Sequence, residues 1–193
     1  MRRLLSAILR YRGWTFEGKT PPDPKVVIPA APHTSNWDFI VFLAAAYALG
    51  IRPRFIAKHG LFRWPLGWAM RRLGGIPVRR DASFRVVEQV VAQIREAPGP
   101  MTLLITPEGT RAAVPYWKSG FYRIAEAADV PMVLGFADYP SRRAGFGPTI
   151  RASGDLSSDM DLIRAFYADK RGLHPERAGP VRLREEGRPA NRA

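Results

Sequence analysis

The chain has 193 residues, enough for one domain with a sizeable core and too few for a second full domain. Hydrophobic residues make up 46% and charged residues 24%, which excludes wholesale disorder, and the lack of cysteine excludes disulfides, thiolate nucleophiles and cysteine-based metal sites. Thirty Lys and Arg against 17 Asp and Glu give a net charge of +13, which favours anionic partners such as nucleic acid, acidic lipid headgroups or phosphorylated ligands.

Residues 1–19 are predicted to form an N-terminal basic amphipathic segment. Its apolar side chains are interleaved with basic ones, namely Leu4, Leu5, Ile8 and Leu9 with Arg2, Arg3, Arg10 and Arg12. Such a helix suits a membrane interface, and it equally suits packing on the protein's own core. No apolar stretch reaches the roughly 20 residues of a transmembrane helix and no signal-peptide pattern is present, so we expect a chain that does not span a bilayer.

From residue 25 onward, predicted strands alternate with predicted helices. The expected strands are 25–29, 54–58, 76–79, 101–106 and 131–136. The expected helices are 36–49, 65–73, 84–96, 120–128 and 157–168. This alternation predicts an α/β fold, a single domain with a mixed, largely covered β-sheet flanked by helices. The domain is expected to cover residues 20–169, and the basic C-terminal tail 170–193 is expected to be solvated or loosely docked.

Residues 32–38, with the sequence PHTSNWD, carry the strongest chemical signal. His33 lies in the loop after a predicted strand, and Asp38 follows five residues later in the first turn of a predicted helix. A carboxylate that folds back onto an imidazole fixes its tautomer and stabilises the imidazolium, as in a catalytic triad, here with a substrate hydroxyl in place of the serine. The alternative is structural, because Ser35 and Asp38 also fit a helix capping box.

A second motif, Glu108-Gly109-Thr110-Arg111, follows the predicted strand 101–106. A glycine turn at the carboxyl end of a strand lets backbone approach a ligand, and an arginine beside it offers a forked donor suited to phosphate. An ordinary turn with a surface pair between Glu108 and Arg111 is the alternative.

The two motifs, about 70 residues apart and in this order, resemble those of the glycerolipid acyltransferase family typified by lysophosphatidate acyltransferase (PlsC-like). Its H-x4-D motif matches His33 and Asp38, and its E-G-T-R motif matches residues 108–111. Two further blocks of the family match in part. One comprises Lys58 and residues 74–80, where Pro77 replaces the aromatic residue that is common in the family. The other comprises residues 130–133, which lack the proline that usually closes this block. The resemblance covers roughly residues 25–140.

The resemblance implies transfer of a fatty acyl group from acyl-CoA or acyl-carrier protein to a hydroxyl of a lysophospholipid, above all 1-acyl-sn-glycerol-3-phosphate, in phospholipid biosynthesis. It also implies the roles of the site residues: His33 as the base, Asp38 as its orienter, Arg80 and Arg111 as phosphate contacts, and Lys58, Glu108, Gly109 and Thr110 as pocket-forming residues. No metal and no permanently bound cofactor are expected.

The expected partners are an acyl thioester donor, a lysophospholipid acceptor and an anionic membrane surface, without nucleic acid. The expected location is cytoplasmic, peripherally on the inner face of the membrane. Two alternatives stay open: an acyltransferase for a non-glycerol lipid or glycolipid, since two blocks diverge, and a basic membrane- or nucleic-acid-binding protein without catalysis. Trp64 and Trp68, four residues apart, are predicted to lie on a packed helix face, and a position at the border of an acyl pocket is the alternative.

Overall fold

One mixed sheet of seven strands, in the order β1-β7-β6-β2-β5-β3-β4, organises the computed structural model, which describes residues 2–78 and 83–186. The strands are β1 (Thr15–Glu17), β2 (Lys25–Ala31), β3 (Pro53–Lys58), β4 (Gly75–Val78), β5 (Met101–Ile105), β6 (Met132–Asp138) and β7 (Arg143–Ile150). The β6–β7 pair is antiparallel and the other neighbouring pairs are parallel. The prediction of a mixed sheet is therefore confirmed.

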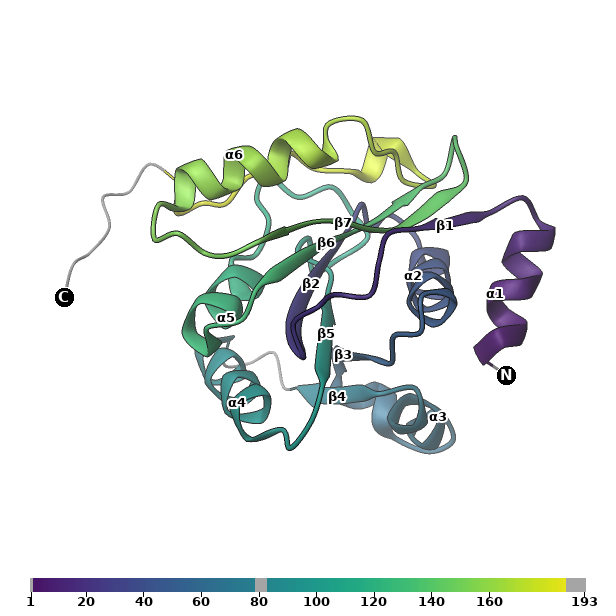
Figure 1. Ribbon diagram of the computed structural model, residues 1–193, viewed down its shortest axis with the longest axis horizontal. Coiled ribbons are helices and arrows are strands. Elements are labelled where there is room, and N and C mark those ends of the chain that lie inside the picture. The colour runs from purple at the N-terminus through teal and green to yellow at the C-terminus, as the bar shows by residue number, and fades with distance from the viewer. Residues whose placement is uncertain (1, 79–82, 187–193) are drawn as a thin grey trace.

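Helices cover both faces of this sheet. They are α1 (Arg2–Tyr11), α2 (Asn36–Ala48), α3 (Leu66–Arg72), α4 (Ser83–Glu96), α5 (Gly120–Ala128) and α6 (Leu156–Tyr167), with short 3-10 turns η1 (His59–Phe62) and η2 (Pro175–Arg177). Figure 1 shows α2 and α3 on one side of the sheet and α4 and α5 on the other. The single α/β domain predicted from the sequence is confirmed.

The central strands are apolar on both faces, and this pattern creates two cores. In β2, Val27 packs in the cluster that includes residues of α4, α5 and α6, whereas Ile28 packs in the cluster on the α2 side. In β5, Leu103 and Leu104 divide between the two clusters in the same way. All four side chains are at most 3% exposed, as expected for parallel strands covered on both faces.

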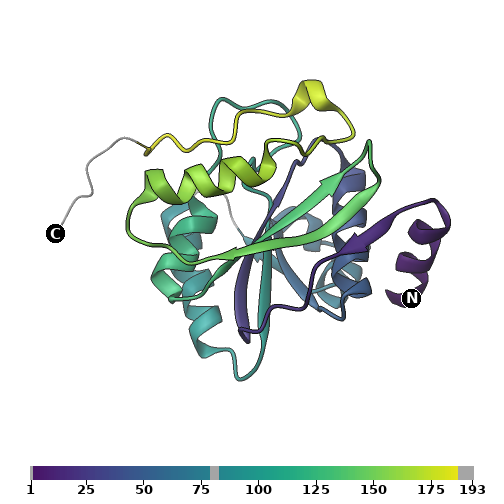
Figure 2. The same ribbon diagram turned by 45° about the horizontal axis from the view of Figure 1, so that its top comes forward.

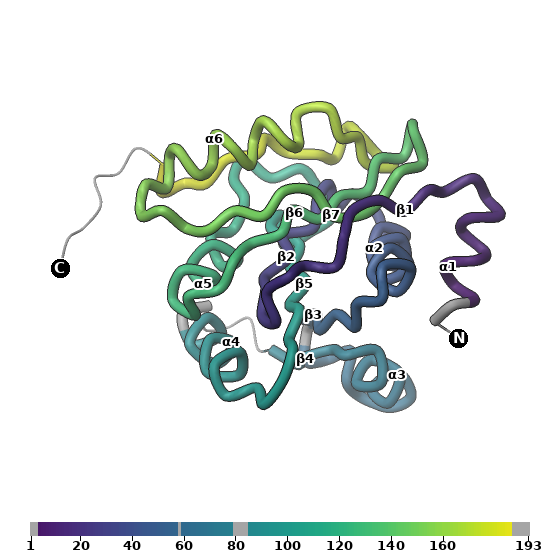
Figure 3. The backbone as a smooth tube through the Cα atoms, viewed as in Figure 1, coloured from purple at the N-terminus to yellow at the C-terminus, as the bar shows by residue number. Residues whose placement is uncertain are grey.

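Helix α1 packs on the domain and also presents apolar side chains to solvent. Leu9 is buried in the α2-side core, and the Ser6 hydroxyl donates a hydrogen bond to the Ala44 carbonyl at 2.9 Å. Leu4 and Ile8 are 61% and 48% exposed. Figure 3 shows α1 at one edge of the molecule, beside α2. Within the described part of the chain, no helix is both long and apolar enough to cross a bilayer.

The structure differs from the expectations in β1, β7 and the C-terminal segment. Sequence patterning did not predict β1 or β7; β1 is three residues long, and Gly145, Gly147 and Pro148 interrupt β7. The tail expected to be solvated or loosely docked is packed where the structure describes it, through residue 186. Leu183 is only 2% exposed, and the segment runs back beside the loop that follows β5 (Figure 2). Burial of Leu183 in the core explains this docking.

Candidate active site

The two motifs meet at one edge of the sheet. The loop that carries His33 follows β2, and the loop that carries residues 108–111 follows β5. The strands β2 and β5 are parallel neighbours, with Pro29 in register with Ile105. Their carboxyl ends therefore lie side by side, which is where α/β sheets place ligand sites.

Asp38 folds back over the start of α2. Ser35 is the N-cap residue, and its hydroxyl accepts a hydrogen bond from the Trp37 amide at 3.2 Å. Oδ2 of Asp38 accepts hydrogen bonds from the amides of Thr34 at 2.6 Å and Ser35 at 2.8 Å. The capping box considered from the sequence is therefore formed, and it satisfies amides that would otherwise be unpaired at the helix start.

The same carboxylate also faces the imidazole. Nδ1 of His33 lies 3.4 Å from Oδ2 of Asp38, within the range of an ion pair but long for a hydrogen bond. Catalytic hydrogen bonds are often long before substrate binds and shorten in the complex. The Asp38 side chain is fully buried, and that of His33 is 13% exposed. Helix capping and histidine orientation are thus compatible roles of one residue.

Asp38 is held in its charged form. Burial works against that form, but the facing His33 ring together with hydrogen bonds from the Tyr139 hydroxyl and from the amides of Ser35 and Thr34 outweigh it and keep the pKa of Asp38 below its usual range. An ionised carboxylate beside Nδ1 favours the tautomer with the proton on Nδ1. The other ring nitrogen, Nε2, is then available to accept a proton.

Tyr139 is a site residue that the sequence analysis missed. Its hydroxyl donates a hydrogen bond of 2.7 Å to Oδ1 of Asp38, the oxygen that the capping amides leave unused. Burial and the neighbouring carboxylate raise the pKa of Tyr139 above its usual value, so it remains a donor. Its ring packs edge-on against Trp14 at 5.1 Å between centroids. Because Tyr139 and Asp38 are 101 positions apart in the sequence, no local pattern could have predicted this contact.

Glu108 supports the backbone of the histidine loop. Its side chain is buried, with the residue 3% exposed, and the His33 amide donates to its Oε2 at 2.8 Å and its Oε1 at 3.1 Å. The alternative of a Glu108–Arg111 surface pair is wrong, because Glu108 is buried and Nη1 of Arg111 donates to Oδ1 of Asn36 at 2.7 Å. Burial raises the pKa of Glu108 to about 7; the His33 amide opposes this rise, and the charge of Asp38 adds to it.

The last two residues of the second motif, Thr110 and Arg111, border a hollow of about 350 Å³. Gly109 adopts a positive φ of 67°, a conformation that favours glycine, and the Lys118 side chain lies 2.8 Å from where a Cβ would be. The hollow is lined by Thr110, Arg111, Ala112, Ala113 and Arg177. Arg111 connects it to α2 through Asn36, three residues after His33.

The two remaining predicted site residues are less fully placed. Lys58 is the last residue of β3, a parallel neighbour of β5, so its backbone ends at the same edge of the sheet as the other site residues. Arg80 lies outside the described residues. The structure therefore brings His33, Asp38 and residues 108–111 together and places Lys58 at the same edge. Among the described residues, no group of three or more His, Cys, Asp or Glu is arranged to hold a metal ion.

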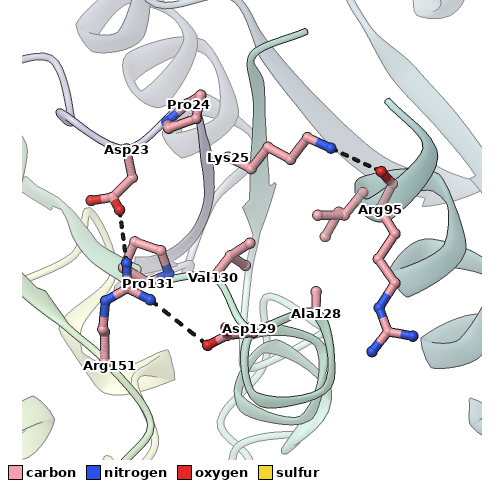
Figure 4. Close-up of a pocket in the computed structure, with 10 residues that line it drawn as sticks. Asp23, Pro24, Lys25, Arg95, Ala128, Asp129, Val130, Pro131 and Arg151 are labelled. Carbon is pink, nitrogen blue, oxygen red and sulfur yellow. Dashed lines mark hydrogen bonds and ion pairs between the residues drawn. The ribbon is translucent and has the colours of Figure 1, made fainter. Parts of the chain in front are cut away.

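A second hollow, of about 260 Å³, lies at the opposite end of β2, where that strand begins with Lys25 (Figure 4). Two of its basic side chains already have acceptors within the protein. Arg151 pairs with Asp23 at 2.8 Å and with Asp129 at 3.8 Å, and Nζ of Lys25 donates to the backbone carbonyl of Arg95 at 2.9 Å. Because these groups have partners and the histidine is remote, this hollow is not the candidate active site.

Fold and site together define a class of protein: an α/β domain with a histidine facing a buried carboxylate, and an arginine-lined hollow that Arg111 links to the same helix start through Asn36, at the carboxyl ends of parallel strands. The family model described as Acyltransferase matches residues 15–134, more than half of the sequence. The chain belongs to this acyltransferase family, as the motifs predict.

Curated relatives and a solved structure agree with this assignment. The chain is 38% identical over 107 residues to "1-acyl-sn-glycerol-3-phosphate acyltransferase epsilon" of Mus musculus, covering 52% of this chain and 29% of the relative. It is 29% identical over 105 residues to the chloroplastic "1-acyl-sn-glycerol-3-phosphate acyltransferase BAT2" of Brassica napus, covering 52% and 30%. These matches span under a third of the length of each relative.

A likeness of fold extends further along the chain. The crystal structure of the 1-acyl-sn-glycerophosphate acyltransferase PlsC from Thermotoga maritima superposes with a TM-score of 0.61 at 16% identity, covering 87% of this chain and 78% of that one. This similarity supports the α/β fold over nearly the whole chain.

Proposed function

We propose that the protein is an O-acyltransferase that moves a fatty acyl group from an acyl thioester to the free hydroxyl of a lysophospholipid, 1-acyl-sn-glycerol-3-phosphate. The observation that carries the proposal is the contact between His33 and Asp38 beside the hollow lined by Arg111. Membership of the acyltransferase family and the names of the two relatives support the same reaction.

The proposed reaction is direct transfer within a complex of donor and acceptor. Nε2 of His33 takes the proton of the acceptor hydroxyl while that oxygen attacks the thioester carbonyl, and Asp38 stabilises the resulting imidazolium. When the carbon–sulfur bond breaks, the imidazolium returns the proton to the leaving thiolate. The N-terminus of α2 lies next to His33, so its dipole favours the negative charge that develops on the carbonyl oxygen.

The proposed reaction can be tested with purified protein. Acyl-CoA and acyl-carrier protein are offered as donors against a panel containing lysophosphatidate, a lysophospholipid with a phosphodiester headgroup, a glycolipid and a non-glycerol lipid alcohol. We expect acylation of lysophosphatidate to exceed that of every other acceptor, with no burst of thiol release before the steady state. Transfer only to the glycolipid or the non-glycerol lipid would contradict the proposed acceptor, and a burst would contradict direct transfer.

An exposed apolar surface supports the proposed membrane partner. We define the aromatic patch as Leu61, Trp64, Leu66 and Trp68, on η1, on α3 and between them, which are 45%, 94%, 55% and 69% exposed. The prediction that Trp64 and Trp68 lie on a packed helix face is therefore wrong, because both project into solvent. Exposed tryptophans of this kind are typical of membrane interfaces.

Basic residues accompany the aromatic patch and favour an anionic bilayer. Arg63, Arg71 and Arg72 are exposed beside it, and Arg10 and Arg12 accompany the exposed apolar residues of α1. Near an anionic membrane each such residue contributes about 1 kcal/mol. We propose that the protein binds the cytoplasmic face of the membrane peripherally through α1 and the aromatic patch.

Membrane binding can be measured by flotation with anionic and with zwitterionic vesicles. We expect the wild type to float with anionic vesicles, and the double variant W64S/W68S to bind them at least about tenfold more weakly, because it loses roughly 1.5–3 kcal/mol of apolar burial per side chain. L162S is the control, since Leu162 is also a large apolar residue that is well exposed, at 60%, but lies on α6. Equal losses in the control and the double variant would contradict the assignment of this surface.

A further inference from the structure

The C-terminal segment, residues 170–186, forms one wall of the candidate active site, although it lies outside the region matched by the family model. Arg171 is fixed to the end of β6, because its amide donates to Oδ1 of Asp138 at 2.9 Å and its carbonyl accepts from the Tyr139 amide at 3.0 Å. The amide of His174 donates to the hydroxyl of the buried Thr34, the residue after His33, at 3.1 Å. The segment therefore crosses the histidine loop itself.

The segment is anchored again beyond η2, against the loop that follows the second motif. The Trp117 amide donates to the Arg182 carbonyl at 2.8 Å, and Nε of Arg182 donates to the Pro115 carbonyl at 2.9 Å. Gly179 lies so close to the Val114 carbonyl that an added Cβ would come within 2.1 Å of its oxygen. Because both ends are held, the turn η2 between them occupies a defined position.

This turn carries Arg177 into the hollow that Thr110 and Arg111 line. The ion pair of Arg177 with Glu176 is long, 3.7 Å from Nε, and both side chains are more than half exposed, so it restrains the guanidinium only weakly. Arg111 enters from the other wall and is held by Asn36. Two forked donors and a threonine hydroxyl thus border one hollow, which suits an anion with several oxygens.

We propose that Arg177 and Arg111 form a two-arginine clamp for a phosphate monoester. We assign this monoester to the phosphate of the lysophosphatidate acceptor, an assignment that rests on the proposed function. The terminal phosphate monoester of coenzyme A has the same chemistry and is the other possible source. A monoester offers three terminal oxygens and up to two negative charges, whereas a diester headgroup offers two oxygens and one charge, so two guanidinium groups favour the monoester.

The test compares R177Q with R184Q, which removes the same charge from the same segment at an exposed residue outside the hollow. Binding of dodecyl phosphate is measured first, without turnover. Steady-state kinetics then vary lysophosphatidate, an uncharged monoacylglycerol, acyl-CoA and the matching dephospho-CoA thioester. We expect R177Q to raise the Kd for dodecyl phosphate and the KM for lysophosphatidate about tenfold, with kcat and the KM for monoacylglycerol unchanged. R177K should restore charge but only part of the affinity.

The outcomes separate the clamp from the proposed reaction. A raised KM for acyl-CoA, but not for the dephospho thioester, would support the clamp and assign it to the donor phosphate. Arg177-dependent binding of dodecyl phosphate by a protein that acylates no phosphorylated acceptor would support the clamp and overturn the proposed reaction. Unchanged constants in R177Q, or equal changes in R184Q, would overturn the clamp.

Discussion

The variants H33A and D38N are each expected to lose about 10³-fold or more in kcat for acyl transfer, because each removes the general base or its orientation. In D38N the side-chain oxygen can still accept from the amides of Thr34 and Ser35, so the capping box and the fold should survive. What it loses is the negative charge that stabilises the imidazolium of His33. Steady-state kinetics with lysophosphatidate and acyl-CoA measure the loss, and thermal unfolding checks that the fold is intact.

A variant of Tyr139 allows the loss of one hydrogen bond to Asp38 to be compared with the loss of the dyad, the pair formed by His33 and Asp38. The variant Y139F keeps the ring that packs on Trp14 and removes only the hydroxyl that donates to Asp38. Its effect on kcat should be about tenfold, the size expected from one hydrogen bond to a charged group, and smaller than that of D38N. Wild-type kcat in H33A or in D38N would show that the dyad is not the catalytic machinery.

The variant E108Q is expected to remove a pH dependence of stability that the wild type shows between about pH 4.5 and 7. In the folded protein the pKa of Glu108 is about 7, whereas the ordinary value is 4.5. Between these values the folded state keeps the proton that the unfolded state has lost, so stability decreases as pH rises. The difference of 2.5 units corresponds to roughly 3 kcal/mol of unfolding free energy.

Denaturant unfolding at pH 5 and pH 8 compares the two proteins. The wild type should lose about 2.5 kcal/mol more than E108Q across this range, since glutamine does not titrate and its carbonyl can still accept from the His33 amide. The variant E108A, which leaves that buried amide without its acceptor, should be destabilised by about 1–3 kcal/mol at pH 8. Parallel pH curves for wild type and E108Q would show that Glu108 is already charged in the folded state.

Local patterns in the sequence were sufficient for the parts of the structure that local physics determines. The apolar run 25–29 predicts a buried strand, and Ser35 with Asp38 predicts the start of a helix; both elements are present. Strand alternation also places both motifs at one edge of the sheet, because the carboxyl ends of parallel strands share an edge. The fold class and this common edge were predictable for these reasons, whereas the contact of His33 with Glu108 depends on β2 and β5 being neighbours, which only the structure shows.

Contacts between distant segments were not predictable in this way. The strand β7 contains two glycines and a proline and exists because β6 offers it an antiparallel partner. Tyr139 and Arg177 reach the site through tertiary packing, with no spacing that marks them. Trp64 and Trp68 have helical spacing that is equally typical of a buried face, and only the structure shows which side of α3 is covered.

Trp14 follows α1 directly, is buried in the α2-side core, and supports the ring of Tyr139, whose hydroxyl reaches Asp38. The segment that follows the amino-terminal helix therefore contacts Asp38 indirectly, through the rings of Trp14 and Tyr139. Truncating this amino-terminal region would disturb the proposed catalysis and the proposed membrane attachment together, so loss of turnover after truncation would not measure attachment alone. Point substitutions at Leu4 and Ile8, which face outward, leave this connection intact and separate the two effects.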